Sequence, residues 1–162
     1  AIEYGYKEPD TRESVCGNEV DRKVLILARE LGLENEFEEI EIENLIPENL
    51  RSGDTQTFLD NIQDIDPHYD ALRSELEEGN VLRYIGDLSG NLQEDKGDLS
   101  VKLVSVPKNS ALGNLKGSDS IFEIYTESYQ DNPITIIGAG AGAEVTARGV
   151  FGDILRLAKH HN

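Results

Sequence analysis

Residues 5–23, with the sequence GYKEPDTRESVCGNEVDRK, constrain the fold most strongly because they join a proline-containing loop to a helix. Glu8 precedes a proline, which disfavours helical backbone, so we expect Glu8 on an extended segment or in a turn. Apolar residues then recur at helical spacing over residues 18–31, and Gly32 follows as a residue that ends helices. The sequence therefore predicts a loop that leads into a helix, with capping groups offered by Ser14, Gly17 and Asn18.

Glu19 and Lys23 are four residues apart, so they share one face of this helix. A surface salt bridge explains most pairs with this spacing and this order of charges. Leu27 continues the same row into an apolar residue, which places the row at the border of the buried face. Spacing alone therefore leaves two interpretations open, a surface ion pair and a chemical role at the edge of a cleft.

The chain of 162 residues is strongly acidic, with 32 Asp and Glu residues against 15 Lys and Arg residues and a net charge of −17. Nucleic acids and anionic membranes favour basic surfaces, so the charge argues against both as partners. The sequence shows neither an apolar run long enough for a transmembrane helix nor a signal peptide. Its length and its 38% hydrophobic content suit a folded domain with a core of its own.

Cys16 is the single cysteine, so no internal disulfide can form and we expect a reducing compartment, the cytoplasm. His160 and His161, at the far C-terminus, make a poor Cys–His case with it, so a packed or capping residue is the better interpretation. No metal site is predicted. The chain holds no methionine, even at its first position, which we interpret as the sign of a fragment of a longer protein.

The rest of the chain alternates between helical and strand-like patterns. The order of these segments predicts an α+β domain, in which a mixed or antiparallel sheet is covered by helices on one face. The two strands between residues 81 and 106 are expected to form a hairpin across a polar loop. We expect strands at residues 37–46, 81–88, 99–106, 121–129 and 133–137. We expect helices over residues 55–78 and 145–157. The first of these is expected in two pieces, broken near Asp66–Pro67, with the second piece at residues 68–78.

Residues 138–143, GAGAGA, follow an apolar strand and precede a helix, and they fit the G-x-G-x-x-A pattern of dinucleotide-binding loops. A complete dinucleotide-binding unit also needs a second strand after the helix and an acidic residue about 20 positions further on. The chain ends 19 residues after Ala143, and the helix uses them. Glycines that allow tight strand-to-helix packing are the alternative interpretation.

Residues 5–23 resemble the signature of homoserine dehydrogenases, which runs close to G-Y-T-E-P-D-P-R-x-D-L-x-G-x-D-V-A-R-K. Residues 133–156, PITIIGAGAGAEVTARGVFGDILR, resemble the C-terminal signature of the same family, and residues 81–86 resemble its V-L-R-Y-V-G strand. The resemblance covers essentially the whole chain in the same order, and it is greatest to the dehydrogenase part of bifunctional aspartokinase–homoserine dehydrogenases. The first signature matches at Gly5, Tyr6, Glu8, Pro9, Asp10, Arg12, Gly17, Val20, Arg22 and Lys23, and the second at Gly138, Gly140, Ala141, Gly142, Val145, Thr146, Ala147, Gly149, Val150 and Asp153.

The resemblance implies an oxidoreductase that interconverts L-homoserine and L-aspartate 4-semialdehyde with NADP or NAD, in threonine, methionine and isoleucine biosynthesis. It implies that Lys23 is the catalytic residue that exchanges the substrate proton, and that Glu8 binds the substrate ammonium. Tyr6, Ser14 and Glu19 would complete the substrate pocket. The cofactor would be lined by Gly138, Gly140, Ala141, Gly142 and Thr146, at the entry to the terminal helix.

The resemblance also implies two regions with different tasks. Residues 1–137 would form the substrate-binding, catalytic and dimerisation domain, and residues 138–162 would complete the nucleotide-binding region. The terminal helix would dock on a Rossmann domain that lies upstream and is missing from this sequence. We therefore expect an inactive isolated fragment of a homodimeric enzyme, with an aspartokinase in the same polypeptide as a further partner domain.

Three positions depart from the family pattern. Glu19 and Ser14 each replace an aspartate, and Asp21 replaces an alanine. If these changes disable the site, the alternative is a non-catalytic interaction or regulatory domain that keeps the fold, or else a generic acidic ligand-binding domain. The joint presence of Glu8 and Lys23 favours the enzyme.

Overall fold

The structure is a computed structural model that describes residues 10–13, 15–91 and 93–160. Helices and short mixed sheets alternate along the chain, which confirms the predicted α+β class. The chain divides into two compact units between Pro107 and Lys108, and each unit is described by itself. The predicted boundary between residues 137 and 138 separates two functional regions and not two compact units, and it stays a prediction.

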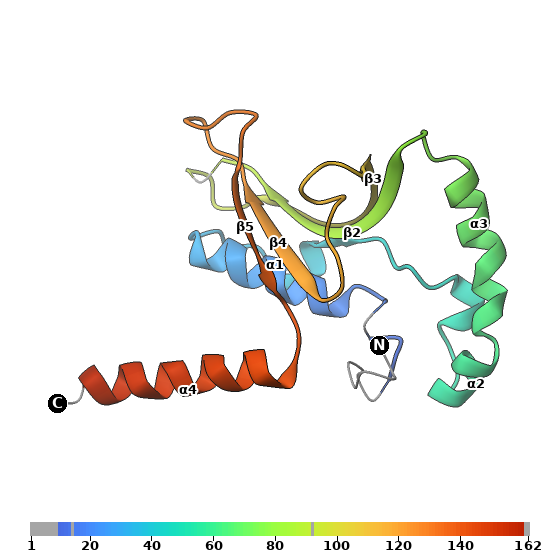
Figure 1. Ribbon diagram of the computed structural model, residues 1–162, viewed down its shortest axis with the longest axis horizontal. Coiled ribbons are helices and arrows are strands. Elements are labelled where there is room, and N and C mark those ends of the chain that lie inside the picture. The colour runs from blue at the N-terminus through green and yellow to red at the C-terminus, as the bar shows by residue number, and fades with distance from the viewer. Residues whose placement is uncertain (1–9, 14, 92, 161–162) are drawn as a thin grey trace. The chain divides into compact units, whose positions relative to one another are not determined.

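The first unit is built on a three-stranded sheet with the strand order β1-β3-β2. Strands β2 (Asn80–Ser89) and β3 (Asp98–Pro107) form the predicted antiparallel hairpin, and β1 (Glu41–Ile42) runs parallel to β3. Helix α1 (Asn18–Glu30) packs against β2 and β3, as Figure 1 shows. The helix expected over residues 18–31 is therefore confirmed to within one residue.

The core of the first unit lies between α1 and the sheet. Gly86 on β2 permits the close approach, because a Cβ atom at this position would lie 2.3 Å from Cγ2 of Val24. Burial of this apolar surface is what holds an amphipathic helix of 13 residues in place. The buried members of the cluster are Val24, Leu25, Ala28, Leu33, Ile40, Leu99 and Val101.

The N-terminus of α1 uses Gly17, one of the three capping residues that the sequence offered. Gly17 is the N-cap residue with a left-handed φ of 100°, and no side chain caps the helix. The side-chain amide of Asn18 donates to the carboxylate of Glu13, at 3.1 Å. Gly32 adopts a φ of +87° after the helix, as expected of a glycine that ends one.

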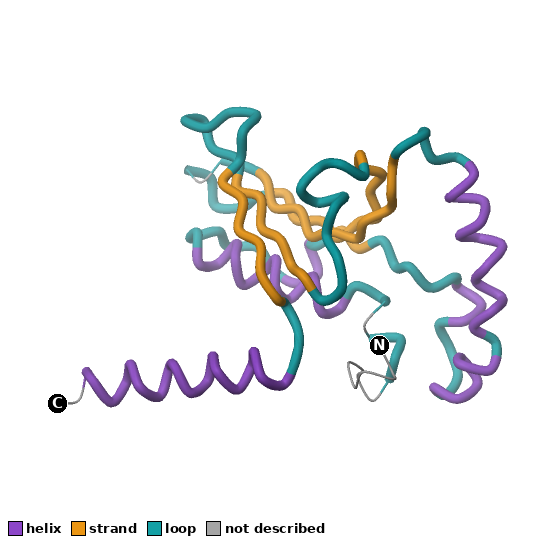
Figure 2. The backbone as a smooth tube through the Cα atoms, in the orientation of Figure 1, coloured by secondary structure: helices purple, strands orange, loops and turns teal. Residues whose placement is uncertain are grey.

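The helical stretch expected between residues 55 and 78 forms in pieces, as predicted, and its last helix begins at Asp66 but ends at Ser74, four residues before the expected end. The stretch contains α2 (Thr55–Asp60), a 3-10 turn (Ile62–Ile65) and α3 (Asp66–Ser74), and Figure 2 shows α2 and α3 in purple. The break comes at Asn61, and Pro67 lies in the first turn of α3, where a proline costs no hydrogen bond. A second 3-10 turn (Glu48–Leu50) precedes them, and Ile46, Leu50 and Phe58 form a second small core.

The strand expected at residues 37–46 is wrong over most of its length. Residues Phe37–Glu39 form a 3-10 turn, and β1 contains two residues, Glu41 and Ile42. Directly after β1, side chains bond to main-chain amides, because Glu43 accepts from the Leu103 amide and Asn44 accepts from the Ile46 amide. Such local bonds compete with a longer strand ladder.

The second unit contains the hairpin of β4 (Asp119–Ile124) and β5 (Ile134–Ala139), followed by α4 (Ala143–His160). These two strands form a sheet of their own. The strand expected at residues 121–129 stops at Ile124 because Thr126 begins a turn. The Thr126 carbonyl accepts from the backbone amides of Tyr129 and Gln130. Among the described residues, no helix combines the length and the apolar character needed to cross a membrane.

Candidate active site

The predicted proton-exchange residue, Lys23, lies on the exposed side of α1, and Glu19 is half-buried one turn earlier. Leu27, one turn further on, is 40% exposed, so this row runs along the border of the packed face as predicted. Within the described part of the chain, no ion pair joins Glu19 to Lys23. The surface salt bridge that spacing alone favours is therefore not formed, and both side chains remain available for a substrate.

Tyr6, Glu8 and Ser14, which the sequence places in the substrate pocket, lie outside the described residues. The described part of this segment, residues 10–13 and 15–16, is called the signature loop below. It leads directly into Gly17 and α1.

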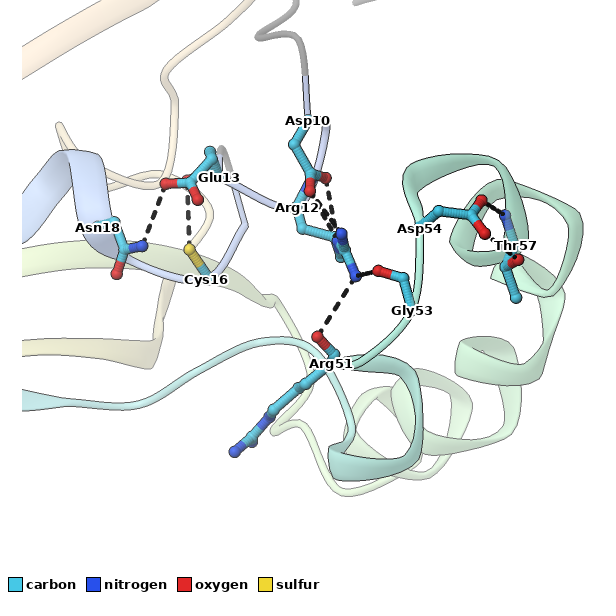
Figure 3. Close-up of polar contacts among 9 residues, drawn as sticks. All are labelled: Asp10, Arg12, Glu13, Cys16, Asn18, Arg51, Gly53, Asp54 and Thr57. Carbon is cyan, nitrogen blue, oxygen red and sulfur yellow. Dashed lines mark hydrogen bonds and ion pairs between the residues drawn. The ribbon is translucent and has the colours of Figure 1, made fainter.

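One end of the signature loop is organised by Asp10 and Arg12 (Figure 3). The Nη2 atom of Arg12 donates to Oδ2 of Asp10 at 2.6 Å, and its Nε atom lies 3.0 Å from both carboxylate oxygens. The Arg12 amide donates to Oδ1 at 3.0 Å. The hydrogen bonds from Arg12 lower the pKa of Asp10 to about 2, so this carboxyl group is ionised at neutral pH.

The same guanidinium reaches a distant part of the chain. Its Nη1 atom donates to the carbonyl oxygens of Gly53 and Arg51, at 2.9 and 3.3 Å. The Arg12 side chain is 16% exposed, although arginine is usually a surface residue. The carbonyls lie just before α2, whose N-terminus is capped by Asp54 through the amide and the hydroxyl of Thr57 (Figure 3). No local pattern in the sequence indicates this contact, because it joins segments about forty residues apart.

The other end of the signature loop is tied to the start of α1. Glu13 accepts from the Asn18 side chain, and the Cys16 thiol donates to the Glu13 carbonyl at 3.5 Å (Figure 3). Cys16 is a free, half-buried thiol that packs against the core of Ile46, Leu50 and Phe58. The structure thus confirms Cys16 as a packed residue.

Asp21, the acid that replaces the family's alanine, belongs to the buried face of α1. Its residue is 0% exposed, one carboxylate oxygen accepts from the Arg22 amide, and the other has no hydrogen-bond partner within the described part of the chain. Burial raises the pKa of Asp21 above its usual value. The new acid therefore lies among the packed residues of α1, with Val24 and Ala28, and away from the exposed Lys23.

The glycine segment begins inside β5, since the strand includes Gly138 and Ala139. A Cβ atom at Gly140 would lie 1.8 Å from Oγ of Ser120, and the Gly140 amide donates to the Ser118 carbonyl at 2.8 Å. Gly140 is therefore required for packing, which is the alternative that the sequence left open. Thr146, in the first turn of α4, donates through its hydroxyl to the Gly142 carbonyl at 3.2 Å.

The remainder of this segment is compatible with the predicted cofactor contact. A Cβ atom at Gly138 would have no heavy atom within 4 Å, so the backbone there faces open space. Gly142 has a φ of +126° and leads into α4, and the first amides of an α-helix have no partner within the helix, so they suit an anionic or polar group. The segment and Lys23 lie in different units, so the structure places each of them only within its own unit. Among the described residues, no group of three or more histidine, cysteine or acidic side chains is arranged to hold a metal.

A model of the homoserine dehydrogenase family matches residues 1–155. The chain belongs to the homoserine dehydrogenase family. It is 41% identical to the homoserine dehydrogenase of Paracoccidioides brasiliensis over 162 residues, which cover 97% of this chain and 42% of that protein. It is also 41% identical over 162 residues to bifunctional aspartokinase/homoserine dehydrogenase 2 of Zea mays, covering 99% of this chain and 17% of that protein.

Among solved structures, a Candida auris protein of unknown function matches with a TM-score of 0.79 and 38% identity. The match covers 96% of this chain and 43% of that one. The chain thus spans less than half the length of the relatives and of the structure named above.

Proposed function

We propose that this chain is the substrate-binding and catalytic region of a homoserine dehydrogenase, which interconverts L-homoserine and L-aspartate 4-semialdehyde with NADP or NAD. The family match over residues 1–155 is the observation that carries the proposal. The chain covers 42% of the Paracoccidioides homoserine dehydrogenase, so the activity belongs to a longer polypeptide. The isolated chain is expected to be inactive because it lacks a complete dinucleotide-binding unit.

The cofactor and the protein have separate tasks in this reaction. When bound, the cofactor carries the hydride to and from the substrate carbon. Lys23 donates a proton to the aldehyde oxygen as the semialdehyde is reduced, and it takes the proton from the homoserine hydroxyl in the reverse direction. The exposed position of Lys23 on α1, with no ion pair to Glu19, supports this assignment.

The remaining substrate contacts are assigned by the family pattern. The carboxylate of Glu8 pairs with the substrate ammonium, and Tyr6 and Ser14 line the same pocket. Glu19, on the same row of α1 as Lys23, holds the substrate or a water molecule next to it. The open backbone at Gly138 and the entry to α4 at Gly142, Ala141 and Thr146 face the nicotinamide.

Exposed apolar surface in the second unit supports two further contacts of the whole enzyme. The β4–β5 hairpin and α4 both present large apolar side chains to solvent, which a folded protein normally covers. We assign these surfaces to the upstream nucleotide-binding domain and to a second subunit in a homodimer. The exposed residues are Phe122, Ile124, Ile134, Ile136, Ile137, Val145, Val150, Phe151, Ile154, Leu155 and Leu157.

Two features of the longer polypeptide follow from its relatives. The Zea mays relative is named as a bifunctional aspartokinase/homoserine dehydrogenase, so an aspartokinase domain in the same chain is proposed as one arrangement. Synthesis of threonine, methionine and isoleucine is the proposed pathway context. The free thiol of Cys16 supports a reducing compartment such as the cytoplasm.

The burial of Asp21 bears on the alternative of a disabled, non-catalytic domain. Two departures, at Ser14 and at Asp21, motivated that alternative. Asp21 is 0% exposed on the packed face of α1, so its carboxylate does not enter a pocket that Lys23 faces. The remaining argument for a disabled site is therefore the single change at Ser14.

Homoserine oxidation by the full-length polypeptide tests the proposal. Lys23→Ala is expected to abolish turnover while the protein stays folded, because the proton then has no acceptor. Lys108→Ala, which removes an exposed lysine in the turn after β3, serves as the matched control and is expected to keep full activity. An inactive, folded wild-type protein, or an active Lys23→Ala variant, would overturn the proposal.

A further inference from the structure

The signature loop is fixed in the first unit mainly by polar contacts of Arg12. Five hydrogen bonds use its guanidinium: Nε and Nη2 donate to the Asp10 carboxylate, and Nη1 donates to the carbonyls of Arg51 and Gly53. We propose that Arg12 is a positioning residue of the enzyme, which fixes the signature loop and, through it, the start of the helix that carries Lys23. This inference rests on the proposed function above.

The segment from Arg51 to Gly53, which Arg12 contacts, is itself bonded to the rest of the first unit. The side chain of Arg51 donates from Nε to the Ile46 carbonyl at 2.7 Å, and Ile46 is 2% exposed in the second core. On the far side of Gly53, Asp54 caps α2, and Phe58 of α2 packs into the same core. The carbonyls that Arg12 contacts therefore lie on an exposed segment that is tied to the second core on both sides.

The backbone of Arg12 makes the second half of the connection. Its carbonyl accepts from the amides of Val15 and Cys16, at 3.0 and 2.9 Å, immediately before Gly17 starts α1. The side chain of Arg12 thus reaches the α2 region while its main chain holds the entry to α1. A displacement of Arg12 would be passed to both ends of the loop.

The proposed catalytic residue is carried by the helix that this connection holds. Gly17, the N-cap residue of α1, follows Cys16 directly, and Lys23 lies on α1. The position of Arg12 therefore affects where the Lys23 ammonium lies. A misplacement of about 1 Å can reduce catalysis by about 100-fold, so a clamp at this position affects the reaction without touching the substrate.

The geometry needs an arginine. The planar guanidinium binds the Asp10 carboxylate with two of its nitrogens and still directs Nη1 toward two carbonyls. A lysine ammonium is a point charge on a flexible stem, and it cannot hold both sides in fixed directions. Replacement by lysine should therefore keep the charge and lose the alignment.

Steady-state kinetics of the full-length polypeptide test the inference. In Arg12→Ala, kcat/KM for homoserine is expected to fall by about 100-fold, with a raised KM for homoserine, while KM for the cofactor changes by less than about 2-fold. Added methylguanidinium should restore part of the activity of Arg12→Ala. Arg73→Ala removes an arginine whose side chain is 74% exposed in an ion pair with Asp70, and it is the control expected to behave as wild type.

Arg12→Lys keeps the test decisive if Arg12→Ala does not fold. It is expected to fold and to show the same preferential loss for homoserine at smaller size. Wild-type kinetics in Arg12→Lys, or equal losses for homoserine and cofactor without rescue, would overturn the inference and leave the proposed function intact. An inactive wild-type polypeptide would instead overturn the proposed function, and the inference with it.

Discussion

The hydroxyl group of Tyr84 occupies the space that a side chain at Gly17 would need. A Cβ atom at Gly17 would lie 2.5 Å from this oxygen and 2.7 Å from Cγ2 of Ile42. Tyr84 is on β2, and its hydroxyl donates to the Glu43 carbonyl at 2.7 Å. Burial, together with nearby Cys16, Glu43 and Asp21, raises the pKa of Tyr84 to about 12. The start of the helix that carries Lys23 is thus docked directly on the sheet.

Gly17→Ala is expected to lower the free energy of unfolding by about 2 kcal/mol or more, because a left-handed φ and a steric clash add together. Urea denaturation followed by circular dichroism measures the change. Gly32→Ala is the matched control, since Gly32 has a φ of +87° at the other end of α1 but open space around it. Equal losses in the two variants would show that contact with Tyr84 contributes nothing.

Gly86→Ala is expected to destabilise the protein by about 1 to 3 kcal/mol through overpacking against α1. The added Cβ atom would lie 2.3 Å from Cγ2 and 3.8 Å from Cβ of Val24. Val24→Ala removes the obstructing methyl groups, so the double variant should be more stable than the sum of the two single changes predicts. Additive losses, measured by the same urea titration, would contradict this contact as the reason for the glycine.

Asp21→Asn is expected to raise the free energy of unfolding at neutral pH by about 1 kcal/mol, because a buried carboxylate with one unpartnered oxygen loses its charge. The raised pKa of Asp21 means that the folded state binds this proton more tightly than the unfolded state does. Its contribution to stability is therefore greatest below the ordinary aspartate pKa and is lost as pH rises through the raised value. Wild type and Asp21→Asn should converge in acid, when unfolding is followed from about pH 3 to about pH 8.

Asp70→Asn, an exposed change on α3, is the control for that comparison. It removes one carboxylate without altering a buried site, so it should leave the stability at neutral pH nearly unchanged. A loss of stability in Asp21→Asn at neutral pH would show that the ionised carboxylate has a partner that stabilises it.

Asp10→Asn should remove a pH dependence of stability that is opposite in sign to the one expected from Asp21. The pKa of Asp10 is lowered to about 2 by hydrogen bonds from Arg12, so the ionised form stabilises the fold. This contribution is present above the ordinary aspartate pKa and is lost as pH falls toward about 2. The difference in unfolding temperature between wild type and Asp10→Asn is expected to be positive at about pH 6 and to shrink at about pH 3. A difference that stays constant between these pH values would contradict the ion pair.

Local patterns in the sequence were sufficient for the elements with strong periodicity. The apolar spacing from Val20 to Ala28 predicted α1, and the two alternating runs on either side of the polar loop predicted the β2–β3 hairpin. In both, neighbouring residues carry the information, because a helix or a hairpin places residues close in sequence on one face. The family signatures added Lys23 and the glycine segment as predicted site residues.

The same approach failed where a side chain competes with the backbone. The strand expected at residues 37–46 shrank to two residues because Glu43 and Asn44 bond to main-chain amides. The strand expected at residues 121–129 ended where Thr126 opens a turn. Alternating apolar residues indicate a strand, but they do not show which side chains will take over its hydrogen bonds.

The contacts that position the site depend on the fold as a whole. Nothing near Arg12 in the sequence indicates that it bonds to Gly53, and nothing near Asp21 indicates that it is 0% exposed beside Val24. The amino-acid order was enough to specify the elements and the chemical groups, because these follow from local periodicity and residue type. Which groups are paired, buried or left free was settled by packing, because a contact across forty residues exists only once both segments have folded against the same core.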